Sequence, residues 1–206
     1  MAEAPMTPRP ALAGRLRLGR HGQMEGAAGV MLRERAGLAV AAIALRDGRK
    51  AALQEALRAG FGLAVPRSRA CTAAGGIELV WTGPNQWLAL DGGRAGHSAF
   101  GFAPDLAAAL GEAAPVTDLT GARAILSLSG PRLRDALCKL LPVDLEECVF
   151  PPGAAAVTLA GHIGVTLWRA PDAGDAWCLA CLRSYGASLV EAVLEAAAEF
   201  GCAVEG

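Results

Sequence analysis

The chain has 206 residues, of which 53% are hydrophobic and 19% are charged, and its formal net charge is −1. This length accommodates one domain or two small halves fused into one. The near-zero charge gives no overall case for nucleic-acid binding, and no run of roughly 18 apolar residues predicts a membrane span. The first residues lack the apolar core of a secretory signal. We therefore expect the six cysteines to be reduced, in the cytoplasm.

Residues 1–37 are rich in arginine, glycine and proline and predict an irregular N-terminal extension. Six arginines and three glutamates give this segment a charge of +3, which leaves −4 for the rest of the chain. A solvated, partly disordered tail explains this pattern. The alternative is a tail that becomes ordered against an acidic partner surface, with Arg15, Arg17 and Arg20 as its candidate contacts.

The first set of predicted elements covers residues 38–115. A continuous apolar run predicts a buried strand at 38–45, and Leu53 and Leu57, one turn apart, predict a helix over 50–59 that stops at Gly60. Strands are expected at 77–81 and 87–90 around a Gly-Pro-Asn turn, and a helix at 104–112 with Pro104 in its first turn. Residues 61–71 are ambiguous.

The second set covers residues 116–206. Alternation predicts a strand over 122–129, and four leucines on one stripe predict a helix that Pro142 ends. A hairpin is expected over 157–168 and a strand over 177–182. The last helix is expected over 185–200, with Ser184 capping its start and Gly201 its end.

The two sets of predicted elements have a similar order of strands and helices, which indicates an internal repeat. Trp87 and Trp177 are 90 positions apart, and each lies in an apolar strand that a helix follows. The predicted fold class is therefore α+β: two similar β-α-β-β-α halves, about 38–115 and 116–206, of the ferredoxin-like or split β-α-β type, fused into one body.

Neither half shows a catalytic constellation. Cys178 and Cys181 have redox spacing, but a position inside a strand sends their side chains to opposite faces. The three histidines have no ligands nearby in sequence, and no phosphate-binding glycine loop follows a strand. Asp118 is a possible general base, but its place before a strand favours a turn residue that binds backbone N–H groups. We predict no catalytic, cofactor-binding or metal site.

Several segments carry a resemblance to a known family. Five segments resemble the folate-binding domain of aminomethyltransferases and appear in the same order. They are residues 81–88 (WTGPNQWL), 116–123 (VTDLTGAR), 142–145 (PVDL), the hairpin at 150–169 and residues 182–185 (LRSY). The form most similar to this chain is the gamma subunit of heterotetrameric sarcosine oxidase, and the related N-methylglutamate dehydrogenase subunit is also similar. The resemblance covers roughly residues 35–203.

This resemblance implies a four-subunit flavoenzyme. FAD, FMN, NAD and tetrahydrofolate are then expected in the partner alpha, beta and delta subunits, where sarcosine is oxidised to glycine with formation of methylenetetrahydrofolate and hydrogen peroxide. The family's folate-dependent enzymes carry acidic residues just after the turn of the hairpin. Here the matching residues 161–166 read GHIGVT, and no Asp or Glu occurs between Glu147 and Asp172. The expected role is that of a structural subunit that lacks the reacting carboxylate.

Candidate contacts with the partner subunits are Trp81, Trp87 and Arg183, besides the three arginines of the extension. Core packing is the alternative for both tryptophans. Two other functions stay open: a free-standing folate or one-carbon-transfer protein, and a self-associating structural protein. The 53% hydrophobic content fits either an alanine-rich domain or one that leaves apolar surface for a partner.

Overall fold

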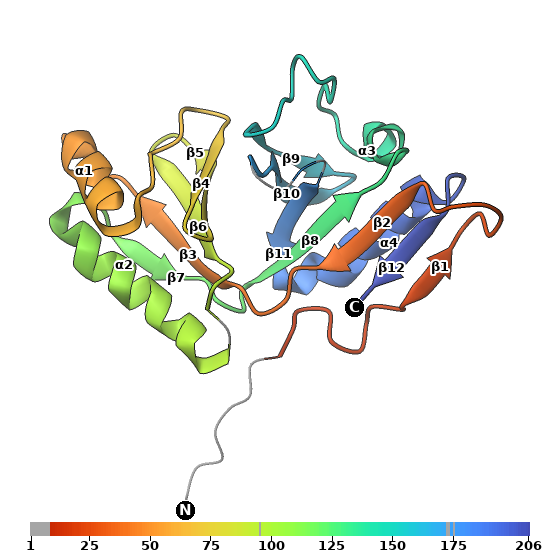
Figure 1. Ribbon diagram of the computed structural model, residues 1–206, viewed down its shortest axis with the longest axis horizontal. Coiled ribbons are helices and arrows are strands. Elements are labelled where there is room, and N and C mark those ends of the chain that lie inside the picture. Colours follow the sequence, from red (N-terminus) through yellow and green to blue (C-terminus); the bar gives the residue numbers. More distant parts are fainter. Residues whose placement is uncertain (1–8, 95, 172–173, 175) are drawn as a thin grey trace, which may run out of the picture.

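The computed structural model of the protein describes residues 9–94, 96–171, 174 and 176–206. These residues form two β-sheets that face each other, and two helices cover the outer side of each sheet (Figure 1). The α+β class is thus confirmed as a mixed fold with two sheets. The longest described helices have 12 residues, whereas a membrane span needs about 20, so none of them could cross a bilayer.

The smaller sheet has five strands in the order β4-β5-β6-β3-β7, all antiparallel. It contains β3 (Ala39–Ala44), β4 (Cys71–Ala74), β5 (Ile77–Gly83), β6 (Gln86–Asp91) and β7 (Val116–Asp118). Helices α1 (Lys50–Phe61) and α2 (Phe102–Leu110) cover it. Leu53 and Leu57 of α1 are buried against the sheet, as their spacing predicts.

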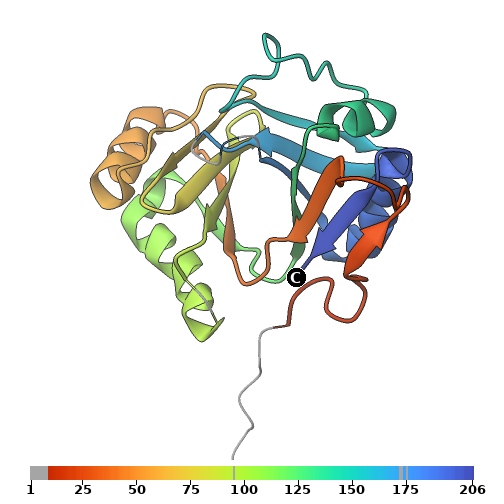
Figure 2. The same cartoon turned by 45° about the vertical axis from the view of Figure 1, so that its right-hand side comes forward.

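The larger sheet has seven strands in the order β1-β12-β2-β8-β11-β10-β9. These are β1 (Gly19–His21), β2 (Val30–Glu34), β8 (Arg123–Ser129), β9 (Ala155–Ala160), β10 (Ile163–Arg169), β11 (Trp177–Leu182) and β12 (Cys202–Glu205). Helices α3 (Leu133–Leu140) and α4 (Gly186–Ala197) cover it. In Figure 2 the blue β12 lies between the two orange-red strands of the N-terminal segment.

The same order of elements occurs twice. The repeated order is strand, helix, three strands, helix, strand. It runs first from β3 through α1 and α2 to β7, and again from β8 through α3 and α4 to β12. Trp87 in β6 and Trp177 in β11 occupy corresponding strands, and each faces the helices of its own half. The predicted division at residue 116 is wrong, because β7 pairs with β3 and completes the sheet of the first half.

The predicted irregular extension is wrong for residues 19–21 and 30–34. β1 pairs with β12, and β2 lies between β12 and β8, so the segment contributes two strands to the larger sheet. Leu12, further upstream, is only 1% exposed and packs in the core of that half. These residues bury apolar side chains against strands made much later in the chain, which offsets the conformational entropy that a free tail would keep.

Two turn predictions are also corrected. α1 ends at Gly62 rather than Gly60, because Gly62 adopts the left-handed conformation with φ 65° and its N–H caps the helix. Ser184 makes no side-chain cap, since α4 is preceded by a short 3-10 turn, η3 (Arg183–Tyr185), with Tyr185 at the N-cap. Gly201 does adopt the left-handed conformation, with φ 67°, but it leads into β12, which the sequence did not predict.

A third apolar cluster fills the space between the two sheets. It contains Trp168, Ile125 and Cys178 from the larger sheet and Val80 and Leu88 from the smaller one. Backbone hydrogen bonds join the sheets at one edge, where Cys71 N donates to Gly153 O at 2.7 Å and Ala155 N donates to Arg69 O at 2.9 Å. The sheets are therefore held together at the start of β4 and β9.

Close packing of α4 on β8 makes a glycine necessary at position 186. A Cβ there would lie 2.7 Å from the Ala124 Cβ and 3.0 Å from Leu12 Cδ2. We predict that Gly186→Ala lowers the free energy of unfolding by about 1–3 kcal/mol because of overpacking, as urea denaturation would measure. Gly164→Ala is the matched control, since no atom lies within 4 Å of a Cβ at that exposed position. Equal stability of the two variants would contradict this packing account.

Candidate partner-binding cleft

Two adjoining pockets lie where β8 begins and β11 ends. Their volumes are ≈ 750 and ≈ 580 Å³, and both are lined by Arg9, Pro10, Ala11 and Arg183. Together we call these two pockets the arginine cleft. The N-terminal turn, the segment before β3 and the turn before β8 form its walls, so residues far apart in the sequence meet there.

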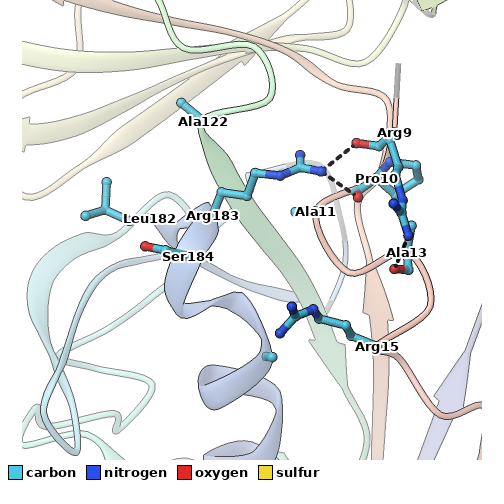
Figure 3. Close-up of a pocket in the computed structure, with 10 residues that line it drawn as sticks. Arg9, Pro10, Ala11, Ala13, Arg15, Ala122, Leu182, Arg183 and Ser184 are labelled. Atoms are coloured by element: carbon cyan, nitrogen blue, oxygen red, sulfur yellow. Dashed lines mark hydrogen bonds between the residues drawn. The ribbon is translucent and has the colours of Figure 1, made fainter. Parts of the chain in front are cut away.

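Arg183 joins the N-terminal turn to the larger sheet. Its guanidinium donates to the carbonyl oxygens of Arg9 and Pro10, at 3.0 and 2.9 Å (Figure 3). It also donates to the carbonyl oxygen of Gly121 at 3.2 Å. These neutral acceptors hold the side chain in place and leave its positive charge uncompensated. Arg15 extends from the opposite wall of the same pocket, which also includes Ala187 of α4 (Figure 3).

Positive charge dominates the cleft. Arg9, Arg15, Arg123 and Arg183 line it, and within the part of the chain that the structure describes none of these four forms an ion pair. The one carboxylate among the lining residues belongs to Glu34, and its Oε1 accepts a hydrogen bond from Leu12 N at 3.0 Å. The cleft can therefore attract anions.

Apolar surface continues from the cleft. Phe100 and Leu182, which line it, are 46% and 49% exposed. Val157 and Leu159 of β9 lie on the same face of the larger sheet as Leu182, the face that is turned toward the smaller sheet. They lie beyond the third cluster and are 52% and 51% exposed. Beside them a groove of ≈ 300 Å³ is lined by both sheets. Large exposed apolar side chains gathered in this way are typical of a protein interface.

A fifth arginine of the cleft, Arg35, is neutralised between the sheets. It donates to both carboxylate oxygens of Glu78, and its Nη1 lies 3.2 Å from Oε2. Trp168 Nε1 donates to the same Oε2 at 2.7 Å, and Arg35 Nη1 also donates to Cys178 Sγ at 3.4 Å. Burial is the largest single influence and lowers the pKa of the Arg35 guanidinium. The hydrogen bonds to Glu78 and Cys178 and the attraction of their negative charges together outweigh it, so the pKa lies above its usual value.

The two cysteines with redox spacing, Cys178 and Cys181, have no activated thiol. Cys178 packs between the sheets and Cys181 on the helix side of β11, which confirms the prediction of opposite faces. Burial raises the pKa of each thiol to about 11. Among the described residues no group of three or more His, Cys, Asp or Glu side chains is arranged to hold a metal ion.

Asp118 is a turn residue, as predicted. Its Oδ1 accepts a hydrogen bond from Thr120 N at 2.8 Å, and Thr120 Oγ1 in turn accepts one from Val40 N at 3.0 Å. The carboxylate thus orders the turn between β7 and β8. At the other end of the larger sheet, the β9–β10 turn borders a groove of ≈ 680 Å³, where His162 lies near Glu191 and Glu195 of α4.

The other predicted contact residues are spread over the molecule. Arg17 lies beside His21, whose Nε2 is 2.8 Å from Arg17 O, and Arg20 bonds to the carbonyl of Gln23 at 2.7 Å. Trp81 and Trp87 are directly paired across β5 and β6 and pack against α1 and α2. Trp87 is only 6% exposed, which is the burial that core packing predicts. The structure brings Arg15 and Arg183 together and leaves the other four predicted residues elsewhere.

Sequence reasoning missed Arg9, Arg123 and Phe100 as residues of the cleft. Arg123 stands at the end of the VTDLTGAR segment, and a charged residue opening an apolar strand is a signal that could have identified it. Arg9 and Phe100 carry no such signal, because only the folded chain brings them near β8.

Comparison with known structures defines the class of fold first. The chain superposes on glycine cleavage system aminomethyltransferase T from Bartonella henselae with a TM-score of 0.57 and 17% identity, over 86% of this chain and 47% of that one. It superposes on a chain of the heterotetrameric sarcosine oxidase from Corynebacterium sp. U-96 with a TM-score of 0.75 and 26% identity, over 93% of this chain and 95% of that one. The chain therefore shares its fold with that sarcosine oxidase chain and with about half of that aminomethyltransferase.

The sequence then defines the particular family. Residues 46–199 match the family described as sarcosine oxidase, gamma subunit. The chain is 32% identical to the sarcosine oxidase subunit gamma of Corynebacterium sp. (strain P-1) over 75% of its length and 72% of that protein's. It is 37% identical to that of Arthrobacter sp, where the match spans about half, 55%, of either chain. The chain belongs to the sarcosine oxidase gamma subunit family.

The ion pair between the sheets gives a stability prediction. We expect Glu78→Gln to lower the free energy of unfolding by about 2–3 kcal/mol, since it leaves the largely buried guanidinium of Arg35 without a counter-charge. Denaturant unfolding would measure the change. The control Glu55→Gln removes an exposed ion pair with Arg58 and should cost less than about 0.5 kcal/mol. Equal effects of the two variants would exclude a special role for the pair.

Burial of the thiols predicts their reactivity. In the native protein at neutral pH, iodoacetamide should modify the exposed Cys138 and Cys148 well before the four buried cysteines, whose thiols are inaccessible and, at pKa values near 11 or 12, almost fully protonated. Because a raised pKa shifts thiolate formation to alkaline pH, modification of Cys178 should stay slow up to about pH 9. Peptide mass spectrometry would follow each site, and rapid labelling of Cys178 would contradict the structure.

Proposed function

We propose that this chain is a non-catalytic, gamma-type subunit of a sarcosine oxidase-type complex with alpha, beta and delta partners. The observation that carries the proposal is the superposition of almost the whole chain, at 26% identity, on a chain of a heterotetrameric sarcosine oxidase. Family membership over residues 46–199 agrees with it. In this proposal the chain takes part in the oxidative demethylation of sarcosine to glycine by holding its partners in place.

The chemistry of the chain supports a structural role. The hairpin β9–β10 has no carboxylate between Glu147 and Asp172 that could exchange a proton with a bound folate. Buried thiols with raised pKa values offer no nucleophile. We therefore assign FAD, FMN, NAD and tetrahydrofolate to the partner subunits, where methylenetetrahydrofolate and hydrogen peroxide would form.

We propose further that the body is a duplicated split β-α-β unit. The support is the element order that β3 to β7 shares with β8 to β12, with β2 inserted between β8 and β12. A cytoplasmic location is part of the same proposal. Its support is that all six cysteines are unpaired, which is typical of a reducing compartment.

Coexpression tests the proposal. The full chain, tagged, should copurify with the products of neighbouring reading frames that encode a flavin amine oxidase, a very large folate-domain chain and a small cysteine-rich chain. The assembled complex should oxidise sarcosine, and omission of this chain should abolish assembly or reduce activity at least about tenfold, because large interfaces would be left uncovered.

The chain alone provides the control. It should neither demethylate sarcosine nor bind tetrahydrofolate saturably in a calorimetric titration. Saturable binding by the isolated chain would favour a free-standing folate protein instead. Demethylation of N-methylglutamate but not sarcosine by the assembled complex would favour the related dehydrogenase.

A further inference from the structure

We infer that the arginine cleft receives an acidic segment of a partner subunit, whose carboxylates pair with Arg15 and Arg123 while an apolar side chain packs on Phe100. This inference rests on the proposed function, since it supposes that the chain has partner subunits. It adds the place at which one partner docks and the chemistry of the segment that fits there.

Charge is the first argument. Four arginines that form no ion pair with any described residue line the cleft, although the whole chain has a net charge of −1. Some arginines elsewhere on the described surface pair with carboxylates, as Arg132 does with Asp135 at 2.7 Å and Arg134 with Glu147 at 2.9 Å. Others form no ion pair among the described residues, but the cleft brings four such arginines to two adjoining pockets. Like charges held together repel one another, and an anion that enters the cleft relieves this repulsion.

Fixed geometry is the second argument. Arg183 is held by three backbone carbonyls, and Arg123 is the first residue of β8, on a strand paired on both sides. Donors that are already positioned lose less conformational entropy when they bind a carboxylate. The side chain of Arg15 is exposed and forms no hydrogen bond within the described part of the chain, so it is available to close over a bound group.

Size and apolar lining favour a peptide over a single ion. The adjoining pockets of ≈ 750 and ≈ 580 Å³ are each far larger than the ≈ 30 Å³ that one water occupies. Leu38 and Val40 line the second pocket together with Phe100, so the cleft has an apolar surface between its charged groups on which an apolar side chain can pack. Arginine and aromatic side chains in this combination are enriched in protein interfaces.

Exposed apolar surface adjoins the arginine cleft, and this favours a folded protein, rather than a free peptide or a small anion, as the source of the bound segment. Leu182 lies at the rim of the cleft, and Val157 and Leu159 continue the same face of the sheet toward its edge strand. A folded partner that inserts an acidic segment into the cleft would cover these side chains in the same contact. A small anion would leave them in water.

Charge reversal tests the inference. The subcomplex of the other subunits is prepared without this chain, and its dissociation constant for the full chain is measured by biolayer interferometry. We expect Arg15→Glu/Arg123→Glu to weaken binding at least about tenfold at about 50 mM NaCl, and the difference to shrink at about 500 mM as salt screens the charges. The control Arg46→Glu/Arg67→Glu has the same net charge at exposed positions outside the cleft and should change binding less than about twofold.

The outcomes separate the two proposals. If the wild-type chain binds the subcomplex and both double variants bind equally well, the inference is overturned and the proposed function stands. If the wild-type chain binds none of the subunits, the proposed function fails and the inference fails with it. Circular dichroism checks the fold of each variant, and Arg15→Gln/Arg123→Gln, with the smaller charge change, replaces the first variant if that one does not fold.

Crosslinking identifies the occupant. A photo-crosslinking amino acid in place of Phe100, in the full chain within the assembled complex, should attach to one segment of a partner subunit that contains more Asp and Glu than Lys and Arg. Mass spectrometry would locate it. Attachment to a neutral or basic segment, or to residues 1–8 of this chain, would overturn the inference.

Discussion

The structure depends on the contact that holds its two sheets face to face. Arg35 comes from the segment that leads from β2 to β3, Glu78 from the smaller sheet and Trp168 from the larger one, and all three meet in one hydrogen-bonded group. Apolar side chains of the third cluster pack beside this group, and its side chains are largely buried, with 19% of Arg35 and 13% of Glu78 exposed. A buried ionic group of this kind contributes little net stability, but it tolerates few alternative arrangements. It therefore fixes how the sheets are placed, and with them the position of every wall of the arginine cleft.

Two kinds of arginine in this protein illustrate one principle. Arg35 and Arg169 are largely buried, and each has a carboxylate within reach, Glu78 for the first and Glu147 for the second. Arg15, Arg123 and Arg183 are on the surface of the cleft and have none in the described part of the chain. Burial makes a counter-charge necessary, whereas water tolerates its absence. Unmatched arginines at one site are thus compatible with a stable subunit and still favour binding of an acidic partner.

Much of the fold follows from local sequence patterns. The strands at Ala39–Ala44 and Arg123–Ser129, the β9–β10 hairpin and the four α-helices of the described residues were predicted from local patterns such as alternating side chains or side chains that recur every helical turn. The turn role of Asp118 was predicted as well, since an aspartate two residues before a backbone N–H forms its hydrogen bond locally.

The parts that could not be predicted depend on distant contacts. β1 and β12 are short, and each finds its partner more than 170 residues away. In β2 the alternation of Val30 and Leu32 with Met31 and Arg33 is real, but arginines and glycines around it suggested a tail. The cleft shows the same limit: Arg15 and Arg183 were named separately, and long-range contacts of the N-terminal turn, such as its hydrogen bonds to Arg183 and the packing of Leu12, bring them to one place.

The insertion of β2 between β8 and β12 has a consequence for biosynthesis. Strands β3 to β7 can complete their sheet once residue 118 has left the ribosome, because every partner they need lies within that stretch. β1 has no neighbour until Cys202–Glu205 is made, and β2 waits for β8 before one of its edges is occupied. β1 therefore stays unpaired, and β2 keeps one edge open, until translation reaches β12. For that period these strand edges favour aggregation of the nascent polypeptide and binding of chaperones.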